Sequence, residues 1–207
     1  GRYKELIIGA GGENIAPVPI EDNIKKLCPY VSNVMMYGDQ KKFNVCVLTL
    51  KTVGATGEAP GTDKLDGEAK QYGKTIADAV ANPKCIADIT KAIKDTGNDG
   101  DVTPSNAAKI QKFTILPTDF SVQTEELTAT LKLKRSVVAE KYQDIIDAMY
   151  ESSETFVPMT VVGVEYNNKG KEEDVRPGSF KANSPLDLVD DDDLKMANSA
   201  DLDKEAA

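Results

Sequence analysis

Gly1-Arg-Tyr-Lys-Glu-Leu-Ile-Ile-Gly-Ala-Gly-Gly-Glu-Asn-Ile15 is the stretch that decides the fold of this 207-residue chain. It opens with charged residues, continues with a short apolar run at residues 6–8 and then reaches a cluster of glycines. Glycine allows positive φ and adds no side-chain bulk, so such a cluster is typical of a turn where the backbone approaches another group closely. The stretch therefore predicts a strand that ends in a glycine turn and forms a hairpin.

A second informative stretch, Thr128-Ala-Thr-Leu-Lys-Leu-Lys-Arg135, alternates leucine and lysine. Successive side chains of an extended chain point to opposite faces, so both leucines would share one face and both lysines the other. From the residues alone, Lys132 is either a functional cation or a solvated lysine on an edge strand, where lysine discourages pairing with other chains. Lys134 is our example of the second kind.

The apolar pattern of residues 17–149 predicts an α+β domain. Apolar side chains recur at helical spacing in residues 20–27, 69–80, 86–93 and 138–149. Runs rich in β-branched residues at 31–37, 43–51 and 111–116 predict three strands, and the nearly all-apolar second run predicts burial on both faces. We expect a compact sheet of about three strands with helices packed on it, preceded by the glycine-turn hairpin.

The charge divides the chain into two parts. Residues 1–151 carry 21 acidic and 19 basic side chains, a net charge of −2, whereas residues 152–207 carry 13 acidic and 6 basic, a net charge of −7. We therefore expect a folded domain over 1–151 and an acidic, mostly disordered tail over 152–207. The domain has no basic stripe with interleaved aromatics, which argues against nucleic-acid binding.

The cysteine and histidine content excludes several kinds of site. The chain has no histidine, so a Cys/His zinc site and any triad that uses histidine are excluded, and we expect no metal site. Its three cysteines form no CxxC pair and suit reduced thiols of a cytosolic domain. No apolar run approaches the roughly 18 residues of a membrane span, and no signal peptide is visible.

In this order, the two stretches resemble the C-terminal domain of acyl-CoA synthetases in the adenylate-forming superfamily, most closely the bubblegum-type long-chain fatty acid enzymes. The resemblance covers residues 1–151. It implies the C-terminal, mobile part of an ATP-dependent long-chain fatty acid–CoA ligase, which forms an acyl-adenylate and then a thioester with coenzyme A. The implied substrates are ATP with Mg²⁺, a fatty acid and coenzyme A. The ATP-binding loops and acyl pocket of such enzymes belong to an N-terminal AMP-binding domain, so we expect this chain alone to be inactive.

The resemblance gives the glycine stretch a role that its residues leave open. By themselves the glycines suit a plain turn or a phosphate cradle, and they match neither a P-loop nor the GxGxxG spacing. In the family this loop lines the tunnel for the pantetheine arm of coenzyme A, which assigns Gly9, Gly11 and Gly12 to the tunnel. Glu13 matches a position that faces the adenylate.

The resemblance also assigns the charged residues of both stretches. Lys4 matches the hinge about which the small domain rotates, and Arg2 lies near the nucleotide in relatives. Lys132 matches the lysine that acts in the adenylation step, and Arg135 matches the arginine that closes the same motif and lies near the nucleotide. Without the family, Arg2 and Lys4 would be exposed charges beside a strand.

Some positions depart from the family pattern. Ala10, Ala16 and Ala129 stand where close relatives usually have Thr, Pro and Pro. An alanine at 129 loosens the turn before Lys132 but removes no reactive group.

Two other functions stay open. One is a non-catalytic interaction module derived from a ligase fragment, whose acidic tail would bind a basic partner. The other is a related adenylate-forming ligase for another carboxylic acid, such as an aryl acid. For the ligase we expect a cytoplasmic location, with peripheral association of the full enzyme with the endoplasmic reticulum or another membrane.

Overall fold

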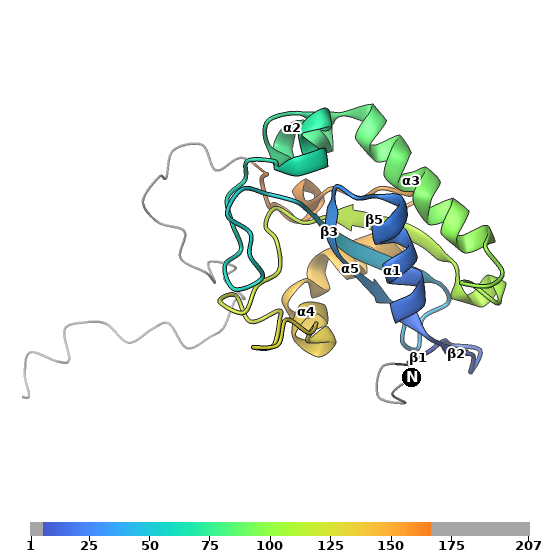
Figure 1. Cartoon of the computed structure of the whole chain (residues 1–207). Coiled ribbons are helices and arrows are strands. Elements are labelled where there is room, and N and C mark those ends of the chain that lie inside the picture. Colours follow the sequence, from blue (N-terminus) through green and yellow to red (C-terminus); the bar gives the residue numbers. More distant parts are fainter. Residues whose placement is uncertain (1–5, 167–207) are drawn as a thin grey trace, which may run out of the picture. The chain divides into compact units, whose positions relative to one another are not determined.

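The computed structural model describes residues 6–166, so Arg2, Lys4 and the stretch 167–207 lie outside the described residues (Figure 1). The elements in chain order are β1 (Ile7–Ile8), β2 (Asn14–Ile15), α1 (Pro17–Leu27), β3 (Val31–Tyr37), β4 (Asn44–Leu50), η2 (Gly67–Tyr72), α2 (Ile76–Ala81), α3 (Pro83–Asn98), η3 (Asn106–Ala108), β5 (Ile110–Ile115), α4 (Arg135–Lys141), α5 (Gln143–Glu151) and η4 (Met159–Val162). Two sheets are present among these residues: the β1–β2 hairpin and a three-stranded sheet. Both were predicted, and the α+β class is confirmed.

The three-stranded sheet has the order β3-β4-β5. Strands β3 and β4 run antiparallel around the turn at Gly38, whereas β4 and β5 run parallel. All seven residues of β4 are buried, as its apolar run predicted, because a central strand is covered on both faces. The segment from η2 to η3 forms the connection that two parallel strands require.

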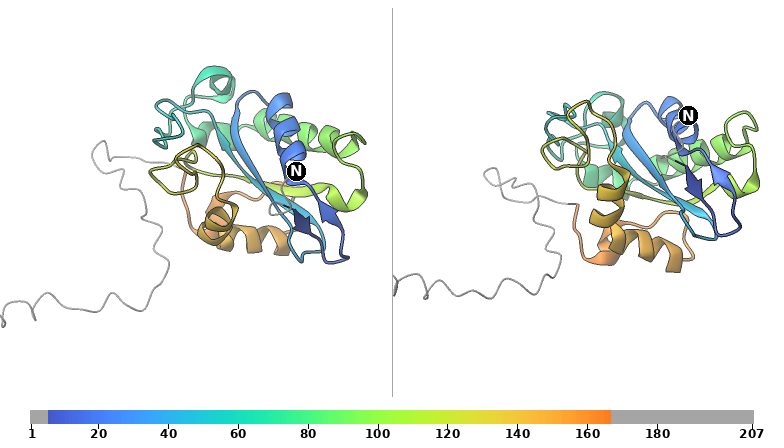
Figure 2. Two further views of the ribbon diagram at one scale, coloured as in Figure 1. Left: turned by 60° about the horizontal axis from the view of Figure 1, so that its bottom comes forward. Right: turned by 90° about the horizontal axis from the view of Figure 1, so that it is seen from below.

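Helices cover both faces of this sheet (Figure 2). Helices α1 and α3 pack against each other, with α1 on β3, and α5 packs against β4 and β5 from the other face. The apolar stripe predicted over 138–149 is confirmed, because it is buried under the sheet. Its members are Val138, Tyr142, Ile145, Ile146 and Met149.

The helix expected over 69–80 is interrupted. Gly73 has a φ of 146° and ends η2, a conformation that side chains rarely adopt. Thr75 then begins α2 with a capping box, in which its side chain accepts from the Asp78 N–H and the Asp78 carboxylate accepts from the Thr75 N–H. The apolar spacing was read correctly, but the turn chemistry at Gly73 divides it into two short helices.

The packed region continues beyond Glu151, where the sequence placed the domain boundary. Phe156 pairs with the edge of β5 through Phe113, and Val157 is buried. The Tyr166 hydroxyl donates to the Ile115 carbonyl at 2.7 Å and accepts from the Met159 N–H at 2.9 Å. Residues 152–166 therefore complete the core beside β5, and the rest of the expected acidic tail lies outside the described residues.

Candidate functional site: two loops beside one groove

The glycine stretch forms the predicted hairpin, with Ile7 opposite Ile15. The Gly9 N–H donates to the Glu13 carbonyl at 3.0 Å, and the Gly12 N–H donates to the Gly9 carbonyl at 2.9 Å. Gly12 has a φ of 85°, the left-handed conformation that favours glycine. These bonds close a tight turn whose backbone at Gly11 and Gly12 is exposed.

The hairpin is fixed to the β3–β4 turn by main-chain hydrogen bonds. The Ala10 N–H donates to the Lys41 carbonyl at 3.1 Å, and the Gln40 N–H donates to the Ile8 carbonyl at 2.8 Å. The Ile8 N–H in turn donates to the Asp39 carboxylate at 3.2 Å. These bonds give the glycine turn a defined position on the domain.

Glu13 folds back over the glycines. A Cβ built at Gly11 would lie 2.6 Å from the Glu13 Oε1 atom, and one at Gly9 would lie 2.9 Å from Oε2. The same carboxylate end is therefore the nearest neighbour of both positions. Because it is the mobile end of an exposed side chain, a side chain at Gly11 would displace it without disturbing the backbone.

The Lys132 segment is a turn, so the alternation of faces that an extended chain would give does not occur. The Thr128 N–H donates to the Lys132 carbonyl at 2.8 Å, and the Leu131 N–H donates to the Thr128 carbonyl at 2.8 Å. Leu131 has a φ of 58°, which breaks the alternation of faces. Lys132 is exposed near the end of this turn, and its ammonium has no ion-pair partner among residues 6–166.

Glu126, which the sequence analysis missed, anchors the start of this turn. Its side chain is fully buried, and its Oε1 atom accepts from the Lys141 ammonium at 2.5 Å and the Tyr142 hydroxyl at 3.3 Å. Its Oε2 atom accepts from the Thr124 hydroxyl and from the Ser121 N–H at 3.3 Å. Burial, and next the charge of Glu126, raise the pKa of Tyr142 far above its usual range, so this hydroxyl stays a donor.

Arg135, at the end of the turn, is held by a second buried carboxylate. Its two terminal nitrogens donate to the two Glu21 oxygens at 2.6 Å each, a bidentate geometry. Glu21 Oε1 also accepts from the Met36 N–H at 2.7 Å. The guanidinium therefore joins α4 to α1 and β3, a structural role that the sequence analysis did not foresee.

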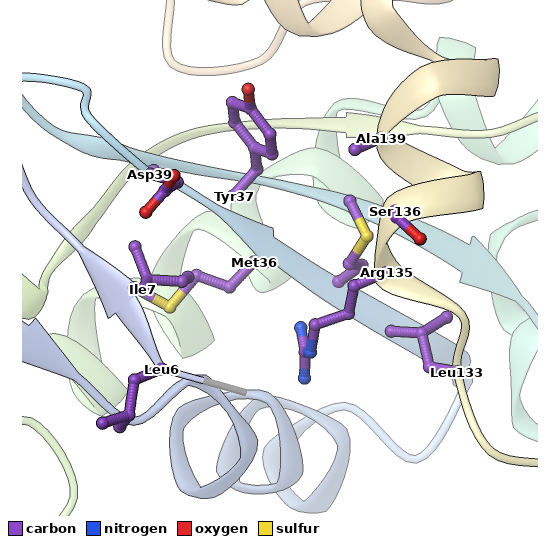
Figure 3. Close-up of a pocket in the computed structure, with 11 residues that line it drawn as sticks. Leu6, Ile7, Met36, Tyr37, Asp39, Leu133, Arg135, Ser136 and Ala139 are labelled. Carbon is purple, nitrogen blue, oxygen red and sulfur yellow. The ribbon is translucent and has the colours of Figure 1, made fainter. Parts of the chain in front are cut away.

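A groove of about 540 Å³ lies between the residues that precede the glycine turn and those that follow Lys132 (Figure 3). Leu6 and Ile7 from the hairpin form one wall, and Leu133, Arg135 and Ser136 form the other. Met35, Met36 and Tyr37 of β3 also line it, and the two methionines are buried. Residues next to the glycine turn and residues next to Lys132 therefore line the same groove, although Lys132 and the glycines themselves do not.

Comparison with known proteins gives the family of the chain. The model of the family described as the AMP-binding enzyme C-terminal domain matches residues 4–154. The chain belongs to this family. The match begins at Lys4 and includes both loops.

Several similar proteins are long-chain-fatty-acid–CoA ligases. The long-chain-fatty-acid–CoA ligase ACSBG2 of Gallus gallus is 44% identical over 164 residues, which are 75% of this chain and 21% of that protein. The Xenopus laevis ACSBG2 is 46% identical over 164 residues, 75% of this chain and 22% of that protein. Human long-chain-fatty-acid–CoA ligase ACSBG1 is 41% identical over 157 residues, 73% of this chain and 22% of that protein. The chain thus spans about a fifth of the length of these relatives.

Solved structures share the fold. The adenylation domain of a carboxylate reductase from Mycobacterium chelonae matches with a TM-score of 0.54 and 18% identity, covering 73% of this chain and 20% of that one. The corresponding domain from Segniliparus rugosus, in complex with AMP and a carboxylic acid, matches with a TM-score of 0.51 and 18% identity, with the same coverage.

Two kinds of feature are absent from the part of the chain that the structure describes. Residues 6–166 contain no group of three or more His, Cys, Asp or Glu side chains placed to hold a metal ion. No helix among them is long and apolar enough to cross a bilayer.

Proposed function

We propose that this chain is the mobile C-terminal domain of an ATP-dependent long-chain fatty acid–CoA ligase. Membership of the AMP-binding enzyme C-terminal domain family carries the proposal, together with the exposed Lys132 at a defined turn, whose ammonium has no ion-pair partner within residues 6–166. The similarity to long-chain ligases of 40% identity and more supports this class of substrate. The partner is an N-terminal AMP-binding domain that would supply the ATP and acyl pockets.

Lys132 would act in the first step. The fatty acid carboxylate attacks the α-phosphorus of ATP, and the bond from that phosphorus to pyrophosphate breaks, so negative charge accumulates on both sides of the phosphorus. A positioned ammonium can hold the carboxylate in line and stabilise that charge. Lysine is a compact donor whose three N–H groups can serve both partners. Arg2, Glu13 and Arg135 would lie nearest the nucleotide.

The glycine loop would act in the second step. Rotation about Lys4 would remove Lys132 from the active site and bring the loop to it, so that the coenzyme A thiol attacks the acyl carbonyl and AMP leaves. Exposed backbone at Gly11 and Gly12, with Gly9 behind it, suits a narrow passage for the pantetheine arm because no side chain fills it.

Mg²⁺ would enter with ATP and be ligated by the N-terminal domain and the phosphates, so the residues of this chain have no step that uses it.

We also propose a cytoplasmic location with peripheral attachment to the endoplasmic reticulum or another membrane. Three buried free thiols support a reducing compartment: Cys28, Cys46 and Cys85. Fractionation of cells that express the tagged full-length protein tests the location.

The function is tested by comparing this chain with the full-length protein. The full-length enzyme should form acyl-CoA from ATP, palmitate and coenzyme A, and the purified 207-residue chain should form none, because Lys132 alone has no aligned phosphate. Benzoate offered beside palmitate separates the long-chain ligase from a ligase for aryl acids. Product from benzoate but not from palmitate would refute the long-chain assignment, and product from neither would refute the ligase.

A further inference from the structure

We propose that Glu126 is the positioning residue of the Lys132 turn, an inference that rests on the proposed function of Lys132. A fully buried carboxylate with four donors stands at the start of this turn. Neither oxygen is left without a partner. Burying a carboxylate costs desolvation free energy. The structural role of Glu126 is therefore to hold the segments that it contacts in place, rather than to add net stability.

Glu126 is joined to the turn through the main chain as well. Its carbonyl accepts from the Lys134 N–H at 2.8 Å, and the next residue, Leu127, bridges to Leu133. The chain that leaves Glu126 therefore returns to it after eight residues, and Lys132 lies on the closed loop between these two contacts. Fixing Glu126 fixes both ends of the loop at once.

The side chain then ties this loop to a helix. The Lys141 ammonium reaches Glu126 Oε1 at 2.5 Å and the Thr124 carbonyl at 3.4 Å, and Tyr142 follows it at the junction of α4 and α5. The loop is thus held against the helical layer that packs on the sheet. A buried ion pair adds little net stability compared with apolar residues of the same shape, but it imposes one geometry. The position of the Lys132 ammonium affects the rate directly, because a displacement of a catalytic group by about 1 Å can lower the rate about 100-fold.

Asp119 provides a matched control seven residues earlier. It is 4% exposed and accepts from the Ser32 hydroxyl at 2.6 Å, the Asn33 amide at 2.8 Å and the Thr49 hydroxyl at 2.5 Å. These partners lie on β3 and β4, not on the Lys132 turn. Asp119 therefore has a similar burial and number of donors but a different task, which is to hold the loop after β5 on the sheet.

The test uses the full-length enzyme with Glu126→Gln and, as control, Asp119→Asn. We expect Glu126→Gln to lower kcat for acyl-adenylate formation by about tenfold to 100-fold with little change in KM for ATP, because binding groups remain and alignment is lost. Thioester formation from supplied acyl-adenylate should change less than threefold or so by the same reasoning, since Lys132 is not used there. Asp119→Asn should lower both steps by the same factor. Lys141→Met removes the other partner of the same buried pair and should reproduce the selective loss.

Hydrogen–deuterium exchange gives a readout that does not depend on catalysis. In Glu126→Gln the amides of residues 127–134 should exchange about tenfold faster or more, while those of β4 remain protected. Unchanged exchange in this segment, or an equal loss in the two half-reactions, would overturn the positioning role. If Lys132→Ala leaves adenylation intact while Glu126→Gln still loosens the turn, the proposed function fails and the anchoring of the turn stands. If Glu126→Gln does not fold, Lys141→Met is used instead. Faster exchange of residues 127–134 together with a selective loss of adenylation in that variant would support the positioning role, and the absence of either would overturn it.

Discussion

The glycine hairpin and the Lys132 turn lie beside one groove, yet they are held in place by different forces. The hairpin is bound to the β3–β4 turn by main-chain hydrogen bonds between exposed segments, whereas the Lys132 turn is bound by two buried carboxylates, Glu126 and Glu21. Main-chain bonds tolerate changes of side chain; buried ion pairs do not. The two loops can therefore be altered separately, which makes the assignment of one half-reaction to each loop testable.

The largest expected effect is that of Lys132→Ala on acyl-adenylate formation by the full-length enzyme. Loss of a preorganised charge contact should reduce this step by about 100-fold to 1,000-fold. Pyrophosphate exchange measures it. Thioester formation from supplied acyl-adenylate should be largely spared, because that step uses the other orientation of the domain.

Lys134→Ala is the matched control for this change. Lys134 stands two residues away in the same motif, and its N–H is bonded to Glu126 through the main chain, which alanine retains. Lys134 is half-buried, and its ammonium has no ion-pair partner among residues 6–166, so its substitution should alter adenylation less than a few-fold. A loss as large as that of Lys132→Ala would mean that the charge of the whole stretch matters, not one ammonium.

The next effect concerns Gly11→Leu, which should spare adenylation and lower thioester formation by about 100-fold. The new side chain meets only the movable carboxylate end of Glu13, and Gly11 has no positive φ, so the fold should survive. Acyl-adenylate should then accumulate while little acyl-CoA appears, as measured by chromatography of a single turnover.

Ala10→Leu controls for added bulk beside the tunnel position. Ala10 is exposed, and its main-chain bond to Lys41 does not depend on the side chain. This variant should lose much less thioester formation than Gly11→Leu. Equal losses in the two variants would mean that the glycines form an ordinary turn and do not line the tunnel, which is the alternative that the sequence left open.

Most of the regular elements could be predicted from the sequence, whereas the roles of the exposed glycines and of Lys132 stay predictions. The apolar pattern predicts the buried strand β4 and the apolar stripe on α4 and α5. The glycines predict the hairpin. Periodicity failed at Lys132, because Leu131 adopts a positive φ that no pattern of leucine and lysine announces. The bonds of Thr128 to this turn, through its N–H, carbonyl and hydroxyl, offer a weak local signal of such a bend.

The anchoring carboxylates could not have been found in this way. Glu21 follows the buried Ile20 in a helix, where an acid is normally solvated, and its partner Arg135 is 114 residues away. Glu126 stands beside Glu125 in the sequence, and only the fold decides that Glu126 is buried while Glu125 is exposed. Such pairs depend on long-range packing, which one sequence does not encode at any local spacing.

Glu21→Gln should produce a smaller effect, and on stability. It removes one charge of the bidentate pair with Arg135, and loss of one partner of a buried pair costs about 3–5 kcal/mol. Because Arg135 keeps contact with water, we expect about 2 kcal/mol in the free energy of unfolding. Urea unfolding of the 207-residue chain measures this. Asp22→Asn, at an exposed pair with Lys25, should change the midpoint very little, and equal shifts in the two variants would contradict the buried anchor.

The smallest effect is expected at Asp88, whose exposed pair provides the contrast to the buried pairs of the Lys132 turn. The Lys84 ammonium at 2.5 Å, and next the Tyr72 hydroxyl at 2.7 Å, hold the pKa of Asp88 below its usual range. A lowered pKa in the folded state stabilises the fold at pH values above the pKa of the unfolded chain, about 3.9. This contribution is lost as the pH falls through the folded-state pKa.

Asp88→Asn should therefore lower Tm by only about 1–2 °C at pH 7, and the difference from wild type should shrink between pH 5 and pH 3. Salt at 1 M should shrink it as well, because screening is strong for exposed charges. The corresponding difference for Glu126→Gln should persist in salt, since its ion pair is buried. Thermal scans of wild type, Asp88→Asn and Glu126→Gln, at low salt and at about 1 M salt, give the Tm differences to be compared. If 1 M salt shrinks the Tm difference of Glu126→Gln, or leaves that of Asp88→Asn unchanged, burial does not distinguish the two kinds of ion pair. The contrast between the two loops would then have no physical basis.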